Sequence, residues 1–189
     1  MTDISDDELV GLSEFALLPE NAEQAGVEGP VPQVQRIDAG SVSALQWGDS
    51  SPRVVFLHGG GQNAHTWDTV IVGLGQPALA VDLPGHGHSA WREDGNYSPQ
   101  NNAATVAPVL NELAPHADLV VGMSLGGLTA IGLGAIAPHL VRELVLVDTR
   151  WRWKPGRKSA PRCFRLVPRT IHRRYAAARR SPRWCRALP

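Results

Sequence analysis

Hydrophobic and polar positions alternate in two short stretches and then give way to continuous apolar runs. Residues 34–38 (VQRID) and 42–47 (VSALQW) alternate, and the three residues between them contain Ala-Gly, which predicts a β-hairpin at the edge of a sheet. Four later runs are apolar throughout, as is typical of parallel strands covered on both faces. These runs are RVVFLHG (53–59), ALAVDLPG (78–85), ADLVVGMS (117–124) and RELVLVD (142–148).

Helical patterns separate the apolar runs, at residues 65–74, 99–113 and 126–137. A strand–helix–strand order implies right-handed crossovers, and therefore a parallel sheet with helices packed against it. The predicted fold class is α/β: a mostly parallel sheet with helices on both faces. Residues 1–30 are acidic and rich in Asn and Gly, which predicts a short helix or a flexible lead-in.

Composition favours one domain with an uneven distribution of charge. The 189 residues, of which 43% are hydrophobic, suffice for one globular domain but not for two ordinary ones. The formal net charge is zero, yet all 18 acidic residues lie at or before Asp148, together with only four arginines. Residues 149–189 hold twelve Arg, two Lys and no acid. We therefore distinguish an acidic lead-in (1–30), a folded part (31–148) and a basic tail (149–189).

Targeting and metal signals are not found in the sequence. The acidic start, MTDISDDEL, lacks the basic and apolar regions of a secretory signal, and no apolar run approaches the ~20 residues that span a bilayer. We expect a cytoplasmic protein without membrane contact. Both cysteines lie in the tail, without CxxC or zinc-like spacing, so we expect neither a disulfide framework nor a metal site.

The loop after residues 117–123 has the pattern of a nucleophile. Gly122, Ser124 and Gly126 form G-x-S-x-G between a predicted strand and a predicted helix. Such a tight turn forces strained dihedral angles on the serine and exposes its hydroxyl near a helix N-terminus, where partial positive charge favours a developing anion. The alternative is that Ser124 only caps the helix, as serine often does.

Two further loops follow predicted strands in the same sheet. The glycines of HGGG (58–61) allow backbone amides to point into a site, as an oxyanion hole requires. A phosphate cradle is the competing interpretation, but neither GxxxxGK[ST] nor GxGxxG with a downstream acid is present. The segment DLPGHGHS (82–89) is a turn rich in Gly and Pro, and it is informative only beside the other two.

Taken together, LHGGGQNAHTW, DLPGHGHS and VGMSLGG, in this order and spacing, resemble the α/β-hydrolase superfamily over roughly residues 34–148. The resemblance implies that Ser124 is the nucleophile and that the amides of Gly60 and Leu125 form the oxyanion hole. It also implies a small-molecule substrate, namely an ester, a thioester, a lactone or a carbon–carbon bond next to a carbonyl, and no cofactor or metal. Serine at 124 speaks against the branch that attacks alkyl halides or epoxides through an aspartate.

Four residues of these loops are candidates for the pocket: Gly61, His58, Trp67 and His88. His58 lies in the turn after a strand, where we expect its ring to brace the loop rather than to transfer protons. Trp67 is expected to pack or to line a pocket, and His88 lies on a loop near the site. Asp82 and Asp148 end predicted strands and are interpreted as acids that form turns.

The acid and the histidine of a triad are not found in this part of the chain. The family order is serine, acid, histidine, on loops after strands that would follow Asp148. The predicted sheet therefore lacks its C-terminal strands, and the truncated edge is expected to favour aggregation. His172 is the only later histidine, and no apolar strand pattern precedes it, so it is a weak candidate for the base.

The basic tail allows two hypotheses. A chain of average composition would hold about five acids in such a segment, which has none. A frameshift in a GC-rich gene, near the codon for Thr149, would explain this and would leave an incomplete hydrolase. Alternatively, a genuine arm of Arg with Trp and Tyr would bind nucleic acid or anionic lipid and make the chain a non-catalytic adaptor. We expect nucleic-acid binding only in the second case, and the oligomeric state stays open.

Overall fold

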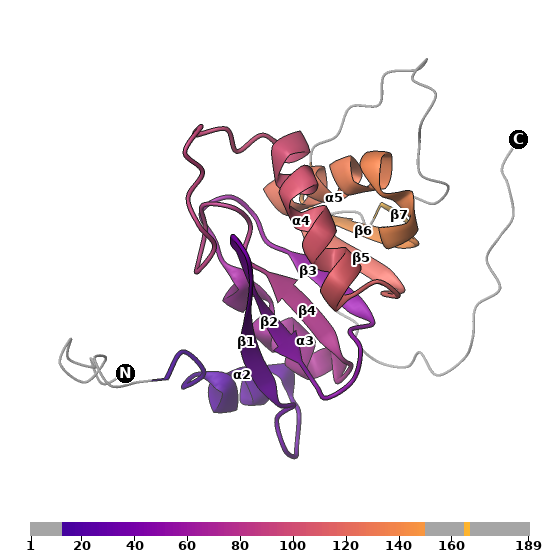
Figure 1. Cartoon of the computed structure of the whole chain (residues 1–189). Helices are drawn as coiled ribbons and strands as arrows, with labels where there is room; N and C mark the ends of the chain where they lie inside the picture. The colour runs from indigo at the N-terminus through magenta and orange to yellow at the C-terminus, as the bar shows by residue number, and fades with distance from the viewer. Residues whose placement is uncertain (1–12, 150–164, 167–189) are drawn as a thin grey trace, which may run out of the picture.

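The computed structural model of the protein describes residues 13–149 and 165–166, which include one mixed sheet (Figure 1). The strand order is β1-β2-β4-β3-β5-β6-β7. β1 pairs with β2, and β2 with β4, in antiparallel orientation, whereas all other pairs are parallel. The strands are β1 (Val34–Ala39), β2 (Val42–Trp47), β3 (Val54–Leu57), β4 (Ala78–Val81), β5 (Leu119–Met123), β6 (Glu143–Val147) and β7 (Arg165–Leu166).

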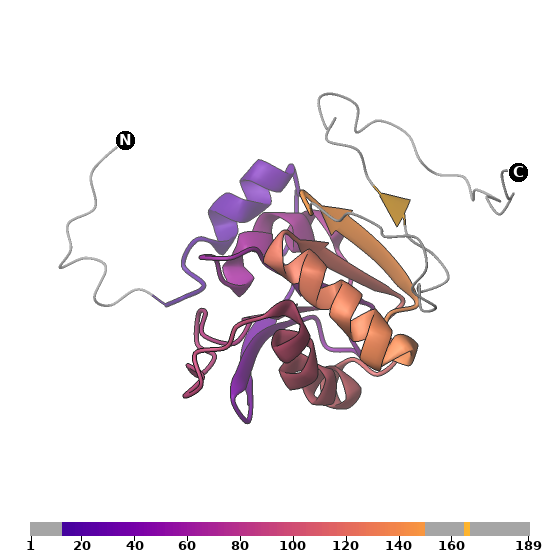
Figure 2. The same cartoon turned by 90° about the horizontal axis from the view of Figure 1, so that it is seen from above.

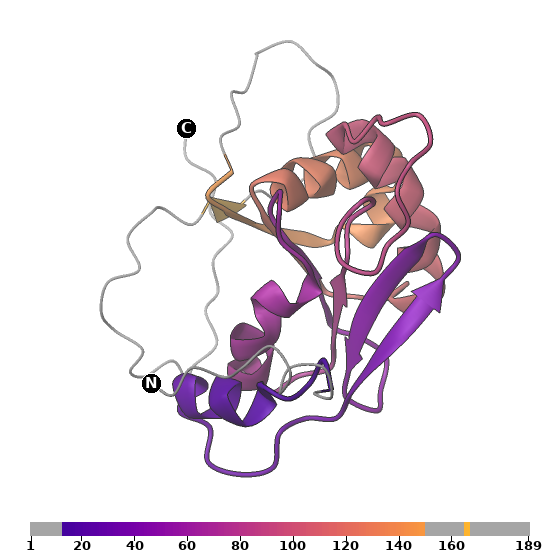
Figure 3. The ribbon, with the colours of Figure 1, turned by 90° about the vertical axis from the view of Figure 1, so that its left-hand side faces the viewer.

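Helices cover both faces of the sheet, with α4 and α5 on one side and α2 and α3 on the other (Figure 2 and Figure 3). The helical segments are α2 (Leu18–Ala25), η1 (Ala64–Trp67), α3 (Asp68–Leu74), α4 (Pro99–Leu113), α5 (Leu125–Ile136) and η2 (Pro138–Leu140), where η denotes a 3₁₀ turn. Successive side chains of β3 enter two different apolar cores. Val55 and Leu57 belong to the core of α4 and α5, and Val54 and Phe56 to that of α2 and α3. This is why β3 is apolar at every position.

The architecture confirms the predicted fold class and the predicted hairpin. The parallel strands end earlier than predicted: glycines follow β3 and a Pro-Gly turn follows β4, whereas β5 and β6 end just before Ser124 and Asp148, two residues with positive φ. The helix at 99–113 has the predicted bounds, and the one predicted at 126–137 begins and ends one residue earlier. The helix predicted at 65–74 is wrong in its first turn, which is the 3₁₀ segment η1. There the side chain of Asn63 accepts a hydrogen bond from the His65 amide at 3.1 Å.

Of two segments outside the predicted sheet, the first contains the short helix that was one of its two alternatives, and the second was not predicted. The lead-in contains the packed helix α2, whose Ala22 is buried and whose Asn21 accepts a hydrogen bond from Thr69 on α3 at 3.0 Å. The apolar pattern predicted no strand after residue 148, but β7 pairs with β6. Such pairing uses backbone groups, which no apolar pattern reveals. The remainder of the basic tail, including His172, lies outside the described residues.

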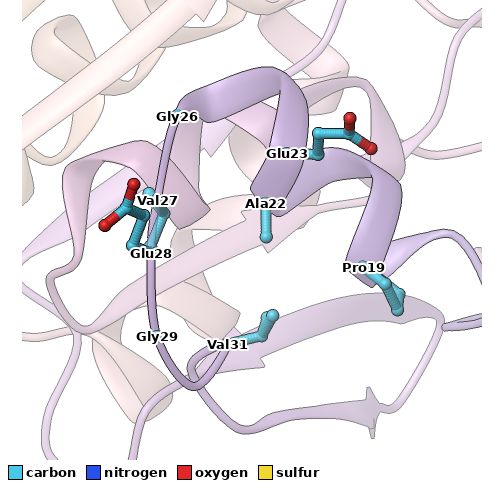
Figure 4. Close-up of a pocket in the computed structure, with 8 residues that line it drawn as sticks. All are labelled: Pro19, Ala22, Glu23, Gly26, Val27, Glu28, Gly29 and Val31. Carbon is cyan, nitrogen blue, oxygen red and sulfur yellow. The ribbon is translucent and has the colours of Figure 1, made fainter.

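A hollow of about 520 Å³ lies beside α2 (Figure 4). It is lined by residues of α2 and of the segment that follows it, namely Pro19, Ala22, Glu23, Gly26, Val27, Glu28, Gly29 and Val31. None of the predicted site residues lines it. In the part of the chain that the structure describes, no helix has both the length and the apolar character needed to cross a membrane.

Candidate active site

Ser124 lies in a strained turn between β5 and α5. Its backbone has φ 46° and ψ −109°, a conformation that side-chain-bearing residues rarely adopt and that often marks a functional site. The turn is fixed on both sides, because the Ser124 amide donates to the Val147 carbonyl and the Ser124 carbonyl accepts from the Leu128 amide, each at 3.0 Å. Ser124 is exposed, and although it occupies the N-cap position, its side chain makes no capping hydrogen bond. The observed geometry therefore does not support the capping alternative.

Two glycines allow the backbone to pass closely around this turn. A Cβ atom at Gly122 would lie 2.7 Å from the carbonyl oxygen of Gly126, and one at Gly126 would clash with the carbonyl oxygens of Leu57 and His58. Only glycine fits such contacts without displacing backbone. As a result the first turn of α5 packs directly against the end of β3, from which the next loop starts.

That loop, residues 58–63, is here termed the oxyanion loop. Gly60 is exposed, and a Cβ built on it would lie 4.0 Å from Cδ2 of Leu125, so the two predicted oxyanion residues are neighbours. Within the described part of the chain, neither of their amides donates a hydrogen bond. Leu125 also opens α5, and the first turn of a helix carries unpaired amides and partial positive charge. Their role in holding an anion next to Ser124 stays a prediction.

His58 is fully buried at the base of the oxyanion loop. Its Nδ1 donates to the Gly59 carbonyl at 2.7 Å, and its Nε2 accepts from the Leu83 amide at 2.9 Å, which indicates a neutral ring protonated at Nδ1. Burial lowers the pKa of His58 from 6.5, which also favours the neutral form. Gln62 fixes the same loop, because its Oε1 accepts from the Gly59 amide at 2.9 Å. The ring of His58 braces the loop and is not available as a base.

The other pocket candidates occupy different environments. Trp67 is 6% exposed and packs against Phe56, with ring centroids 5.1 Å apart. Gly61 is exposed at φ 74°, in the left-handed region. His88 is also exposed, and its amide donates to Oδ2 of Asp82 at 3.0 Å. Gly61 and His88 therefore lie at the surface, whereas Trp67 and His58 belong to the interior.

The two aspartates at strand ends also differ. Asp82 follows β4 and is fully buried; its Oδ1 accepts from the Ala64 amide at 2.7 Å, and its Oδ2 accepts from Arg36 at 2.8 Å. Asp148 follows β6 and is exposed at φ 45°. Arg36 was not predicted as a partner of Asp82, because its position on an alternating strand gives no local signal of a residue 46 positions away.

Among the described residues, no group of three or more His, Cys, Asp or Glu is placed to hold a metal ion. The weak candidate base, His172, falls outside them, as do residues 150–164 and 167–189 of the basic tail. The arrangement at Ser124 combines an exposed hydroxyl with two neighbouring backbone amides. Chemically, such an arrangement suits addition of an oxygen nucleophile to a carbonyl, because the amides can hold the oxyanion that forms.

Several known esterases are similar to this chain. Esterase Rv0045c of Mycobacterium tuberculosis is 79% identical over 145 residues, which are 77% of this chain and 49% of that protein. A solved structure of that esterase matches with a TM-score of 0.73 and 78% identity, over 74% of this chain and 48% of the other. A pimeloyl-[acyl-carrier protein] methyl ester esterase of Pseudoalteromonas atlantica is 35% identical over 57% of this chain and 41% of that protein.

This chain therefore spans about half the length of the curated relatives that it matches. A family model described as "Alpha/beta hydrolase family" matches residues 54–189, which is more than half of the chain. The strand order, the elbow at Ser124 and this match lead to the same conclusion: the chain belongs to the alpha/beta hydrolase family.

Proposed function

We propose that this chain supplies the nucleophile and the oxyanion hole of a hydrolase that acts on carboxylic esters. The observation that carries the proposal is the exposed Ser124, held at positive φ between β5 and α5 without a capping hydrogen bond. The neighbouring Gly60 and Leu125 amides support it. Thioesters, lactones and activated carbon–carbon bonds share the same carbonyl chemistry, and the relatives named as esterases favour the ester.

In the proposed reaction, Oγ of Ser124 attacks the ester carbonyl carbon and its proton passes to a general base. The carbonyl oxygen becomes an oxyanion, which accepts hydrogen bonds from the amides of Gly60 and Leu125. Collapse of this intermediate breaks the bond to the alcohol, which leaves with a proton, and water then releases the acid from the serine. The described residues supply the nucleophile and both amides; a base is not assigned among them.

A phosphonate probe tests the nucleophile independently of that base. The 189-residue chain is incubated at pH 8 with an alkyl fluorophosphonate, and the modified serines are identified by mass spectrometry. Attack by Oγ expels fluoride, and hydroxide in the buffer takes the proton. Ser51 is exposed on an ordinary loop and serves as the internal reference.

We expect Ser124 to react at least about tenfold faster than Ser51, since an oxyanion hole and binding retain part of the rate when triad members are absent. Ser124→Ala should remove the modified peptide and leave the reaction at Ser51 unchanged. Equal rates at Ser124 and Ser51 in the folded chain would overturn the proposal.

A further inference from the structure

A buried carboxylate links the two loops that flank the candidate site. Asp82 accepts hydrogen bonds from the Ala64 amide, just after the oxyanion loop, at 2.7 Å and from the His88 amide at 3.0 Å. The loop after β4 wraps tightly around this carboxylate, because a Cβ at Gly87 would clash with it. The position of both loops therefore depends on a charged group at the end of β4.

Arg36, on the antiparallel strand β1, supplies the counter-charge. Its Nη1 donates to Oδ2 of Asp82 at 2.8 Å and to Oγ of Ser43 at 2.9 Å. The Arg36 side chain is only 12% exposed, and that of Asp82 is fully buried. A buried carboxylate without such a partner is strongly destabilising, so Asp82 can hold the two amides only while Arg36 is present.

The Arg36 guanidinium also binds a second carboxylate, which in turn contacts the η1 segment through His65. Glu14 precedes α2, and its Oε2 accepts from Nε and Nη2 of Arg36 at 2.8 and 2.6 Å. That oxygen also lies 3.3 Å from Nε2 of His65, whose Nδ1 lies 2.7 Å from Asp68. His65 directly follows Ala64, so Arg36 reaches η1 along two routes, through Asp82 to Ala64 and through Glu14 to His65.

We propose that Arg36 is a positioning residue for the oxyanion loop, and that Glu14 is its second anchor. η1 begins at Ala64, only four residues after Gly60. Fixing η1 from both sides sets where the Gly60 amide points relative to Ser124. The catalytic consequence rests on the proposed function, whereas the effect on the loop does not.

Hydrogen–deuterium exchange and fluorophosphonate labelling of the 189-residue chain test the two parts separately. Arg36→Gln should raise exchange in peptides covering residues 58–66 and 83–90, with peptides of α4 and α5 unchanged. It should also slow labelling of Ser124 about tenfold relative to Ser51, because small displacements of a catalytic group cost large factors in rate. Arg36→Lys keeps the charge but cannot bridge both carboxylates as a guanidinium does, so it should recover part of the rate.

Arg53→Gln is the matched control, since Arg53 pairs with Asp118 at 2.6 Å in an exposed position at the amino ends of the strands. It should change neither readout. Glu14→Gln removes only the outer anchor, and we expect it to fold and to raise exchange in 58–66 by a smaller amount. This variant keeps the test decisive if Arg36→Gln does not fold.

Unchanged exchange in the oxyanion loop of the folded variants would overturn the proposal, as would an equal rise throughout the chain. If Ser124 of the unmodified chain is not labelled faster than Ser51, the proposed function fails, yet the exchange data still decide whether Arg36 positions the loop. Slower labelling in Arg36→Gln with recovery in Arg36→Lys would support both parts together.

Discussion

The two ends of the parallel strands are built differently from the same kinds of residues. At the amino ends, Arg53 and Asp118 form an ion pair whose side chains are 62% and 49% exposed. At the carboxyl ends, Arg36 and Asp82 form a pair whose side chains are 12% and 0% exposed and which also fixes the Ala64 and His88 amides. Exposed pairs contribute little to stability, whereas breaking a buried pair leaves an uncompensated charge.

Glycines at the two ends of the strands also differ in how closely other atoms surround them. Gly75 ends α3 at φ 62°, and nothing lies within 4 Å of a Cβ built there. Gly126, in the elbow, has backbone carbonyls where its Cβ would be. We therefore expect the amino ends of the strands to tolerate substitution better than the carboxyl ends, where backbone contacts are close and charge is buried. The candidate site lies at these carboxyl ends.

The largest expected effect comes from Gly126→Ala. The added methyl group would displace the end of β3 or the start of α5, so we expect a loss of more than about 3 kcal/mol in the free energy of unfolding, or no folded protein. Gly75→Ala is the control, with an expected cost of about 1 kcal/mol because only its positive φ is disfavoured. Denaturant unfolding of both variants measures this, and equal losses would contradict the contrast.

Asp82→Ala is expected to be the next most harmful change. It removes one of the two carboxylates that Arg36 binds and leaves the buried Ala64 amide and the His88 amide without their acceptor, so we expect a loss of about 3–5 kcal/mol in unfolding free energy. Asp118→Ala, at the exposed pair, should cost no more than about 1 kcal/mol. The comparison uses urea unfolding of each variant at the same pH; a cost for Asp82→Ala as small as that for Asp118→Ala would show that the buried pair fixes nothing.

The contacts of Glu14 should make the free energy of unfolding depend on pH, with an effect smaller than those of Gly126→Ala and Asp82→Ala. The hydrogen bond that Nδ1 of His65 donates to the Asp68 carboxylate raises the pKa of His65 above 6.5, so the contribution of His65 to stability is present below pH 6.5 and lost as the pH rises through the folded pKa. A hydrogen bond from Arg36 lowers the pKa of Glu14 below 4.5, so its contribution is present above pH 4.5 and lost as the pH falls through the folded pKa. The chain should therefore exceed Glu14→Gln in stability most clearly between pH 4.5 and 6.5.

The measurement is the unfolding free energy of both proteins from pH 4 to 8. At pH 8 the difference should shrink without vanishing, because Arg36 still pairs with Glu14. Glu20→Gln, on the exposed side of α2, is the control and should show no such maximum. A difference that is constant across the range would mean that His65 does not interact with Glu14.

The smallest expected effect is that of salt on the coupling energies of the exposed and the buried ion pair. Raising NaCl from 0.05 to 1 M shortens the screening length to about 3 Å, which weakens exposed pairs more than buried ones. A double-mutant cycle for Arg53 and Asp118 should lose most of its coupling energy of about 0.5 kcal/mol. The cycle for Arg36 and Asp82 should keep its coupling, and equal losses would show that both pairs are open to solvent.

Much of the fold could be predicted because its signals are local. The continuous apolar run of β3 reflects burial on both faces, and Gly122, Ser124 and Gly126 define a strand–turn–helix within a few residues. Backbone sterics alone make such a turn tight and place the serine in front of a helix N-terminus. The glycines of the oxyanion loop are equally local, and the structure places Gly60 next to Leu125. Their catalytic roles stay predictions.

The rest could not be predicted, because it depends on residues brought together from distant parts of the chain. Arg36 meets Asp82 across 46 positions and Glu14 across 22, and neither the alternation of β1 nor the composition of the lead-in specifies these partners. The 3₁₀ start of the helix predicted at 65–74 follows from a local cap at Asn63 that periodicity does not reveal. Local sterics and burial are written into the sequence, which is why the hairpin, the four central parallel strands and the elbow could be predicted from it. Which charges meet beside the oxyanion loop depends on tertiary packing, because a buried ion pair exists only once the layers have packed.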